Sequence, residues 1–202
     1  TMNDILVLYY SRNGATEALA REVCNGIDSV AGASARLRTV PAVSAVSEAT
    51  SKPVPDEGPP YATHADLREC CGLVMGSPAR FGNMAAALKY FLDSTSGLWL
   101  SGALAGKPAG LFTSSSSLHG GQETALLSMA LPLMHHGMLI TGIPYTEKAL
   151  QETRTGGTPY GASHVTWNRS ADKLSNEEKE LAQVLGKRVA GIALRLFERS
   201  DD

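Results

Sequence analysis

Long hydrophobic runs are absent from this sequence, and their absence excludes one class of protein. No apolar stretch in the 202 residues approaches the roughly 20 residues that a membrane-spanning helix needs. The N-terminal run DILVLYY is too short for a signal peptide and has no basic segment before it. We therefore expect no membrane insertion, and we interpret DILVLYY as the first strand of the fold.

Cysteine is scarce as well. The three cysteines are Cys24, Cys70 and Cys71, and they include an adjacent pair but no C-x-x-C motif. An odd number without that motif favours reduced thiols and hence a cytoplasmic protein. We prefer buried structural thiols over a catalytic cysteine as the interpretation.

An excess of basic residues is also missing. Lys and Arg number 18 against 20 Asp and Glu, which gives a net charge of −2 at pH 7. Nucleic-acid phosphates require clustered basic side chains, so nucleic acid is not the expected partner. The five histidines include no i, i+4 pair suited to a metal, so we expect no metal site.

Short apolar runs alternate with helical patterns along most of the chain. The runs that predict strands lie at residues 4–10, 33–40, 72–77, 107–113 and 138–143. Apolar residues at helical spacing predict helices over 16–27, 84–92 and 123–135. This alternation is typical of a parallel sheet that is covered on both faces. We predict an α/β fold with a doubly wound five-stranded parallel sheet, whose ligands bind at the carboxyl ends of the strands.

The last helix has a clear beginning. Ser175 followed by Glu178 forms a capping box, which is typical of a helix N-terminus. Gly186 and Gly191 lower the intrinsic helix propensity of this segment. We therefore predict close packing against another element at both glycines.

Two stretches interrupt the alternation. Residues 41–62 hold five of the ten prolines and predict a long loop insertion. Residues 151–166, with TGGTPYGASH at their centre, predict a second long loop. We expect residues 1–202 to form a single domain that carries both insertions.

The first of three polar loops is SRNGAT, residues 11–16, between a predicted strand and a helix. Backbone N–H groups and the helix dipole favour an anion at such a position. The donors of Ser11, Asn13 and Thr16 suit a phosphate monoester, and Gly14 lets the backbone approach it closely. The alternative is an ordinary helix N-terminus in which these side chains act as caps. The loop matches neither the Walker motif nor G-x-G-x-x-G.

The second and third loops are predicted to meet the first at one edge of the sheet. In PARFGN, residues 78–83, Phe81 is suited to stacking on a planar ring, and Arg80 and Asn83 to bonding ring carbonyls. A plain surface charge is the alternative for Arg80. The third loop, TSSSSLHGGQET at 113–124, offers small donors, and a flexible linker is its alternative. A phosphate site beside a slot for a planar heterocycle describes a mononucleotide, and FMN is the candidate.

The same motifs carry a family resemblance. SRNGAT, GSPARFGNMAAALKYFLDSTSGLW, GGQET, LMHHGM and RTGGTPYGA, in that order, resemble the WrbA-type NAD(P)H:quinone oxidoreductases, FMN proteins with a flavodoxin-like fold. The resemblance covers most of the chain and is weakest in the proline-rich loop and at the carboxyl end. It implies FMN as cofactor, NADH or NADPH as co-substrate, and two-electron hydride transfer through FMN to a quinone. It also implies a homo-oligomer, a tetramer whose subunits complete one another's sites.

The resemblance further implies which residues form the site. The residues implied for the FMN phosphate are Ser11, Arg12, Asn13, Gly14, Ala15 and Thr16. Those implied for the ring are Pro78, Ala79, Arg80, Phe81, Gly82, Asn83, Thr113, Ser114, Ser115, Ser116 and Ser117. His136 is implied near the pyrimidine side as a proton donor, and Trp99 as a wall of the substrate cavity, both as catalytic residues. The alternative is a structural role for His136 and a place in an interface or core for Trp99. This chain departs from the family pattern by placing Arg12-Asn13 where an apolar–aromatic pair is expected.

Two other functions stay open. A flavodoxin-type electron carrier shares the fold and the cofactor, but such carriers are strongly acidic and this chain is nearly neutral. A non-enzymatic regulatory, repressor-binding protein would need a dedicated partner surface, which the sequence does not display. The preference between NADH and NADPH, the physiological quinone and the choice between dimer and tetramer also stay open.

Overall fold

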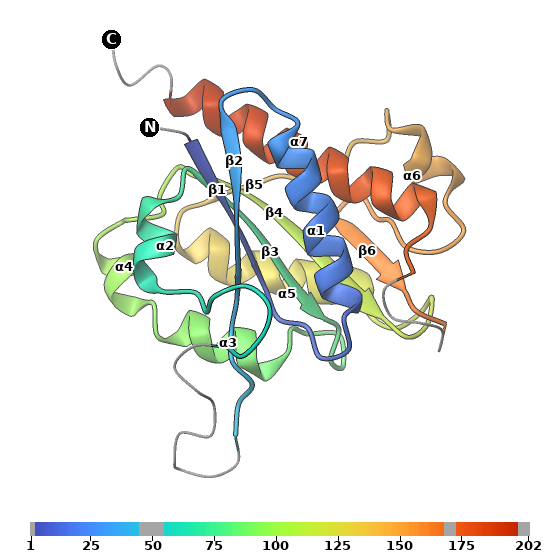
Figure 1. The fold of residues 1–202 in the computed structure, drawn as a ribbon, viewed down its shortest axis with the longest axis horizontal. Coiled ribbons are helices and arrows are strands. Elements are labelled where there is room, and N and C mark those ends of the chain that lie inside the picture. The colour runs from blue at the N-terminus through green and yellow to red at the C-terminus, as the bar shows by residue number, and fades with distance from the viewer. Residues whose placement is uncertain (1–2, 45–54, 168–172, 198–202) are drawn as a thin grey trace.

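The computed structural model describes residues 3–44, 55–167 and 173–197. Strands and helices alternate along these residues (Figure 1). The elements are β1 (Asn3–Tyr9), α1 (Ala15–Asp28), β2 (Ala33–Thr39), α2 (His64–Glu69), β3 (Gly72–Pro78), α3 (Ala86–Asp93), α4 (Ser96–Leu100), β4 (Pro108–Ser115), α5 (Gln122–His135), β5 (Leu139–Ile140), α6 (Lys148–Glu152), β6 (Ala162–Val165) and α7 (Asn176–Phe197). Residues 45–54 of the proline-rich stretch lie outside the described residues, and the single-domain organisation stays a prediction.

The predicted parallel sheet is confirmed. Its strands follow the order β2-β1-β3-β4-β5, and every pairing between neighbours is parallel. The order reverses beside β1, where the chain moves to β3 on its other side. Ligands of doubly wound sheets bind at the carboxyl ends of the strands near such a reversal.

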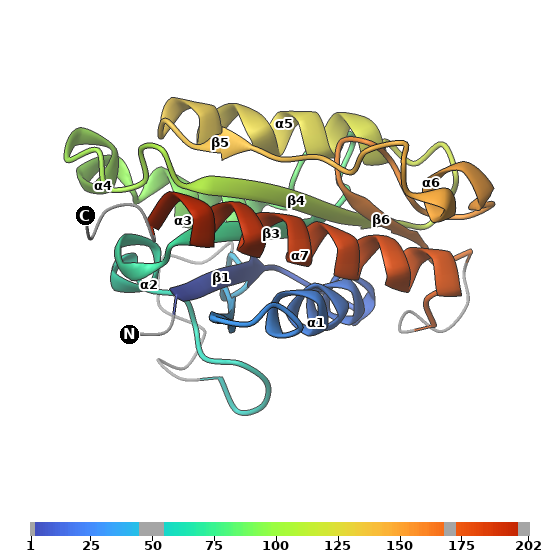
Figure 2. The ribbon, with the colours of Figure 1, turned by 90° about the horizontal axis from the view of Figure 1, so that it is seen from above.

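Both faces of the sheet are covered, which explains the continuous apolar strands. In β1, Ile5 and Val7 pack with α1 and α7, whereas Leu6 and Leu8 pack with α3 and α5 on the opposite face. Figure 2 shows α1 and α7 running side by side along the sheet. Because successive side chains of a strand point to opposite faces, a strand between two helical layers needs apolar residues at every position.

The second predicted loop contains a strand that the sequence analysis missed. β6 pairs with β4 along Phe112–Ser115, while β5 pairs with β4 only at Pro108 and Ala109. Two short strands therefore share one edge of β4, and the strand predicted at 138–143 shrinks to two residues. The prediction of a loop at 151–166 missed β6, because a four-residue strand among glycines and a proline has too little local pattern to identify it.

The capping box of α7 is confirmed. The Ser175 hydroxyl accepts from the Glu178 N–H at 3.2 Å, and the Ser175 N–H donates to the Glu178 carboxylate at 2.9 Å. Close packing is confirmed at Gly186, where a Cβ would overlap the Val23 carbonyl of α1. It is wrong at Gly191, where a Cβ would meet open space.

In the part of the chain that the structure describes, no helix has the length and hydrophobicity to cross a membrane.

Candidate functional site

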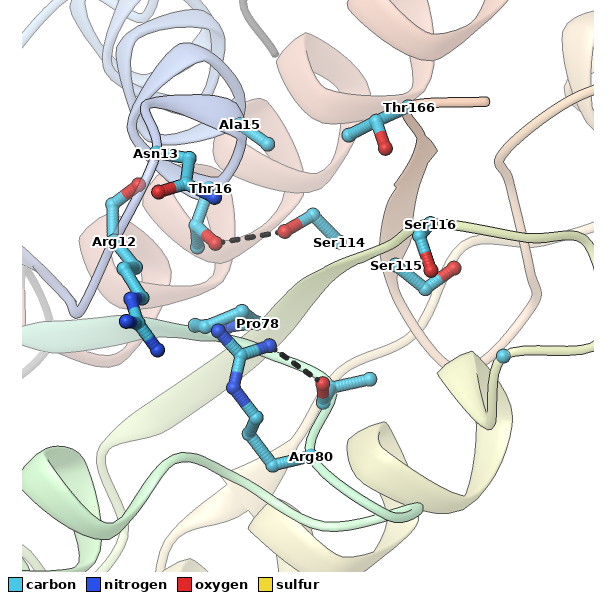
Figure 3. A pocket seen from close by; sticks show the side chains of 13 residues that line it. Arg12, Asn13, Ala15, Thr16, Pro78, Arg80, Ser114, Ser115, Ser116 and Thr166 are labelled. Atoms are coloured by element: carbon cyan, nitrogen blue, oxygen red, sulfur yellow. Dashed lines mark hydrogen bonds between the residues drawn. The ribbon is translucent and has the colours of Figure 1, made fainter. Parts of the chain in front are cut away.

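A cavity of about 410 Å³ lies at the carboxyl ends of β1, β3 and β4 (Figure 3). The residues that line it are Ser11, Arg12, Asn13, Ala15, Thr16, Pro78, Ala79, Arg80, Ser114, Ser115, Ser116, Gly120 and Thr166. The three loops predicted to meet at this edge therefore do meet. The volume lies in the range of about 300 to 1,000 Å³ that is typical of ligand pockets. We call it the first cavity.

The first cavity is open to the N-terminus of α1. Gly14 occupies the N-cap position with φ of 87°, a left-handed conformation that favours glycine, and no side chain caps the helix. The Ser11 hydroxyl accepts from the Gly14 N–H at 3.1 Å instead of reaching into the first turn. Ala15 and Thr16, whose N–H groups have no intrahelical partner at this position, line the cavity. The alternative of ordinary side-chain capping is therefore wrong.

The hydroxyl of Thr16 has a structural partner. It shares a hydrogen bond of 2.9 Å with the Ser114 hydroxyl, and both side chains are buried (Figure 3). This bond joins the first turn of α1 to the end of β4. The two loops that bring them, one after β1 and one after β4, are thereby held at a fixed spacing around the cavity.

The charged side chains that line the first cavity are all positive. Its lining includes two arginines, Arg12 and Arg80, and no Asp or Glu among the described residues. The acidic residue in the first turn of α1, Glu17, is paired with Arg21 at 2.6 Å and does not line the cavity. At the N-terminus of α1, free N–H groups and hydroxyls in a cavity without a carboxylate form a donor set that fits a phosphate dianion. The residues present therefore fit the phosphate end of a mononucleotide.

The PARFGN loop is a tight turn. The Arg80 N–H donates to the Asn83 carbonyl at 2.8 Å, and the Asn83 N–H donates to the Arg80 carbonyl at 3.0 Å. Phe81 and Gly82 between them have φ of 52° and 75°, as in a type I′ turn. Phe81 is fully exposed, although a bulky residue rarely adopts positive φ. Strain at an exposed aromatic residue is typical of a ligand-contacting site.

Asn83 holds this turn rather than lining the first cavity. Its side-chain oxygen accepts from the Met84 N–H at 2.8 Å and from the Ser128 hydroxyl at 3.1 Å. Pro78, Ala79 and Arg80 line the cavity, whereas the residues of the turn itself, 81–83, do not.

The serine-rich loop after β4 is ordered by its own hydrogen bonds. The Ser117 carbonyl accepts from the Ser115 hydroxyl and from the Gln122 side-chain amide, each at 2.7 Å. A flexible linker has no such bonds, so that alternative is wrong for residues 115–117. Thr113 is fully buried and donates to the Ser77 carbonyl at 2.8 Å, so it supports the site from beneath.

His136 and Trp99 lie in a different cavity, which we call the second cavity. It measures about 350 Å³ and includes Thr95 and His135 in its lining. His136 follows α5, and Gly137 next to it accepts from the Gly106 N–H at 2.9 Å, just before β4 begins. Gly106 precedes Ser114, the first residue of β4 that lines the first cavity, by eight positions, which is about 25 Å at ~3.3 Å per residue. Figures 1 and 2 show α4, which carries Trp99, at this opposite end of the sheet.

The position of His136 in the second cavity affects its hydrogen bonding and its pKa. Its Nε2 is 2.9 Å from the Thr95 hydroxyl, and its Nδ1 is buried without a partner among the described residues. Burial, helped by the neighbouring His135, lowers the pKa of His136 below its ordinary value. The imidazole is therefore neutral at neutral pH, and its buried Nδ1 has no hydrogen-bond partner among the described residues.

Two residues of the first cavity were missed by the sequence analysis. Gly120 lies in the glycine pair before α5, and Thr166 follows β6. The Thr166 N–H donates to the Ser115 carbonyl at 2.9 Å, which continues the pairing of β6 with β4. The strand-favouring pair Val165-Thr166 was the available signal, but it gains meaning only once β6 is placed beside β4.

The strand order, with a cavity at the carboxyl ends of the strands beside its reversal, defines the flavodoxin-like class of folds. Solved structures support this class. A WrbA-like flavodoxin from Agrobacterium tumefaciens is similar with a TM-score of 0.67 and 23% identity, covering 96% of this chain and 98% of the other. A flavodoxin from the domain Archaea is similar with a TM-score of 0.62 and 19% identity, covering 94% and 98%.

Sequence comparisons define the family. The model of the NADPH-dependent FMN reductase family matches residues 4–148. A protein of Gluconacetobacter diazotrophicus named NAD(P)H dehydrogenase (quinone) is 41% identical over 199 residues, covering 96% of this chain and 99% of its own length. The chain belongs to the NADPH-dependent FMN reductase family, and the resemblance predicted from its motifs is confirmed.

Proposed function

We propose that this protein is an FMN-dependent NAD(P)H:quinone oxidoreductase, which transfers two electrons from NAD(P)H through FMN to a quinone. The observation that carries the proposal is the first cavity, which is rich in donors, free of carboxylates and open to an uncapped helix N-terminus. The relative from Gluconacetobacter diazotrophicus, which is named NAD(P)H dehydrogenase (quinone), supports the choice of substrates.

The chain's own residues are suited to bind FMN in two parts. The N–H groups of the first turn of α1, with the hydroxyls of Ser11 and Thr16, would hold the phosphate. The segments at 78–83 and 113–117 would flank the ring, with Pro78 and Ala79 excluding water from one side. FMN, when bound, supplies the capacity to accept and donate a hydride, and the protein supplies binding, orientation and electrostatics.

We also propose that the active form is a homo-oligomer, a tetramer with sites shared between subunits. The second cavity lies too far from the first cavity of its own chain to serve it, so His136 and Trp99 would act on the FMN of a neighbour. There a neutral His136 would donate an N–H to the quinone oxygen, and Trp99 would wall the cavity.

Exposed apolar side chains support this assembly. Leu127, Leu131 and Met134 form a stripe at i, i+4 and i+7 on α5, each about half exposed. Trp99 and the neighbouring Leu100 are exposed near one end of that stripe. Light scattering of Leu131→Lys should show smaller particles than the wild type, and an unchanged mass would contradict this surface as the interface.

We keep a cytoplasmic location in the proposal, because Cys24, Cys70 and Cys71 are free thiols of the kind that reducing compartments maintain. Burial raises the pKa of Cys24 to about 12 and that of Cys70 to about 11, so neither is a reactive thiolate.

An anaerobic titration tests the function. The FMN-loaded protein receives NADPH or NADH, then benzoquinone, while the visible absorption of the flavin is followed. Loss of the oxidised absorption with the nucleotide, and its rapid return with the quinone, is the expected result. Tight FMN binding without any loss on adding either nucleotide would contradict a reductase and favour the electron carrier.

A further inference from the structure

Neither arginine of the first cavity has a carboxylate partner within the described residues. The Arg12 side chain makes no hydrogen bond or ion pair within the described residues, and the Arg80 guanidinium donates only to the Ala79 carbonyl, at 2.9 Å. By contrast, Arg21 pairs with Glu17, and Arg38 pairs with Asp66. Arg12 and Arg80 are therefore cations with nearly all of their donors unused.

These two side chains converge from different loops. Arg12 comes from the loop after β1 and Arg80 from the turn after β3, and both line the first cavity. Figure 3 shows their guanidinium groups pointing toward one another beside Pro78. Two like charges in one cavity repel each other, and an anion bound between them offsets this repulsion by attracting both. Such an arrangement favours a ligand that carries two negative charges.

The Arg12–Arg80 pair is separate from the phosphate-binding end at α1. That end is built from backbone N–H groups and hydroxyls, and it is already suited to one phosphate without a guanidinium. The Arg12 side chain extends away from α1 toward Pro78 (Figure 3). The cavity thus offers two anion positions, whereas FMN carries one phosphate.

We propose that Arg12 and Arg80 bind the 2′-phosphate of NADPH, and that this subsite selects NADPH over NADH. The inference rests on the proposed function, because it assigns the second anion to the co-substrate. A phosphate monoester carries nearly two negative charges at neutral pH, and guanidinium groups bind phosphate through paired hydrogen bonds. NADPH differs from NADH by one such monoester, so two unpaired guanidinium groups discriminate between them.

Binding of a fragment tests the subsite without turnover. Calorimetry measures the affinity of the FMN-loaded protein for 2′,5′-ADP, which carries the 2′-phosphate, and for 5′-AMP, which lacks it. We expect Arg12→Met to weaken 2′,5′-ADP binding by about tenfold or more, since a charge-assisted contact is lost. Arg12→Lys should give an intermediate loss, because it keeps the charge without the planar fork. Arg21→Met is the matched control, since Arg21 lies on the exposed face of α1.

Kinetics and cofactor binding complete the test. In Arg12→Met the ratio of kcat/KM for NADPH to that for NADH should fall by about tenfold, through a higher KM for NADPH. An equal loss with both nucleotides would overturn the inference, and so would a loss of FMN affinity by the apoprotein as large as the loss for 2′,5′-ADP. If 2′,5′-ADP binds in an Arg12-dependent way but neither nucleotide reduces the flavin, the subsite stands and the proposed function fails.

Discussion

The N-termini of α1 and α7 solve one physical problem in opposite ways. Every helix begins with N–H groups that have no intrahelical partner. At α7 the capping box of Ser175 and Glu178 satisfies two N–H groups from within the protein, those of Ser175 and Glu178 themselves. At α1 the N-cap is Gly14, which has no side chain to offer, and the helix opens into a cavity. The first arrangement stabilises the fold, and the second leaves donors for a ligand.

Glu178 accepts further hydrogen bonds beyond the capping box of α7. Its carboxylate, 1% exposed, also accepts from the Gly156 N–H at 2.8 Å, the Val165 N–H at 3.1 Å and the His164 Nδ1 at 2.8 Å. One side chain therefore joins α7, the loop before β6 and β6 itself. At α1 the acidic residue of the first turn, Glu17, points to solvent and pairs with Arg21. The comparison indicates that a negative charge is part of the fold at α7, whereas the N-terminus of α1 lies uncapped beside the first cavity.

The largest effect on stability is expected from removing the Glu178 carboxylate at the N-terminus of α7. Glu178→Ala leaves three buried donors and one partly buried donor without an acceptor, so the free energy of unfolding should fall by about 3 to 5 kcal/mol. Urea unfolding of the apoprotein measures this. Glu180→Ala, two residues on and exposed, should change it by less than about 0.5 kcal/mol. Similar stabilities for the two variants would show that the Glu178 network is not structural.

A negative charge placed near the N-terminus of α1 should change the affinity for FMN rather than the stability of the fold. Asn13→Asp is isosteric and adds a carboxylate to the first cavity. Repulsion of the phosphate should weaken FMN binding by about 10- to 100-fold, while the stability of the apoprotein holds or rises because anions favour helix N-termini. Fluorescence titration with FMN and with riboflavin, which has no phosphate, measures the effect. A loss that is equal for riboflavin would contradict a phosphate site here.

The hydrogen bond between Thr16 and Ser114 should contribute less to stability than the Glu178 carboxylate does. Thr16→Val removes the 2.9 Å bond to Ser114, and one buried hydrogen bond is worth about 1 kcal/mol. Urea unfolding of the apoprotein should show that loss, and Thr16→Ser, which retains a hydroxyl, should recover most of it. If Thr16→Ser were as unstable as Thr16→Val, the methyl group rather than the hydroxyl would be responsible.

The smallest expected effect is a difference in acid sensitivity between the wild type and Glu178→Gln. Burial alone would raise the pKa of Glu178, but hydrogen bonds from His164 and from backbone N–H groups lower it below its ordinary value of 4.5. A depressed folded-state pKa contributes stability that is present above 4.5 and is lost as the pH falls below it. Stability of the wild type should therefore fall more steeply with acid than that of Glu178→Gln. Parallel curves for the two proteins below that pH would contradict this.

Much of the fold and part of the site followed from local patterns. The runs at 4–10 and 72–77 predicted β1 and β3 because strands buried on both faces must be apolar throughout. The SRNGAT loop was identified because a strand followed by a glycine and a helix places N–H groups at one point. The meeting of three loops then followed from the parallel sheet, whose carboxyl ends share one edge.

Other features depend on pairs of residues far apart in the chain. β6 forms only because β4 has a free edge beside Phe112–Ser115, and four residues carry too weak a pattern to show this. The capping role of Glu178 was readable from Ser175, but its bonds to Gly156 and Val165 were not. Likewise, HHGM gave no sign that His136 lies at the opposite end of β4 from the first cavity.

The sequence by itself determined the alternation of strands and helices, the α/β class and the donors of the three loops, because spacing and residue type act over a few neighbouring residues. Only the tertiary structure decided which donors stay free, since hydrogen-bond partners such as Ser114 for Thr16 are 98 residues apart. It also decided that Arg12 and Arg80 share one cavity without a carboxylate. Electrostatic interactions depend on distance in space, which the order of residues along the chain does not give.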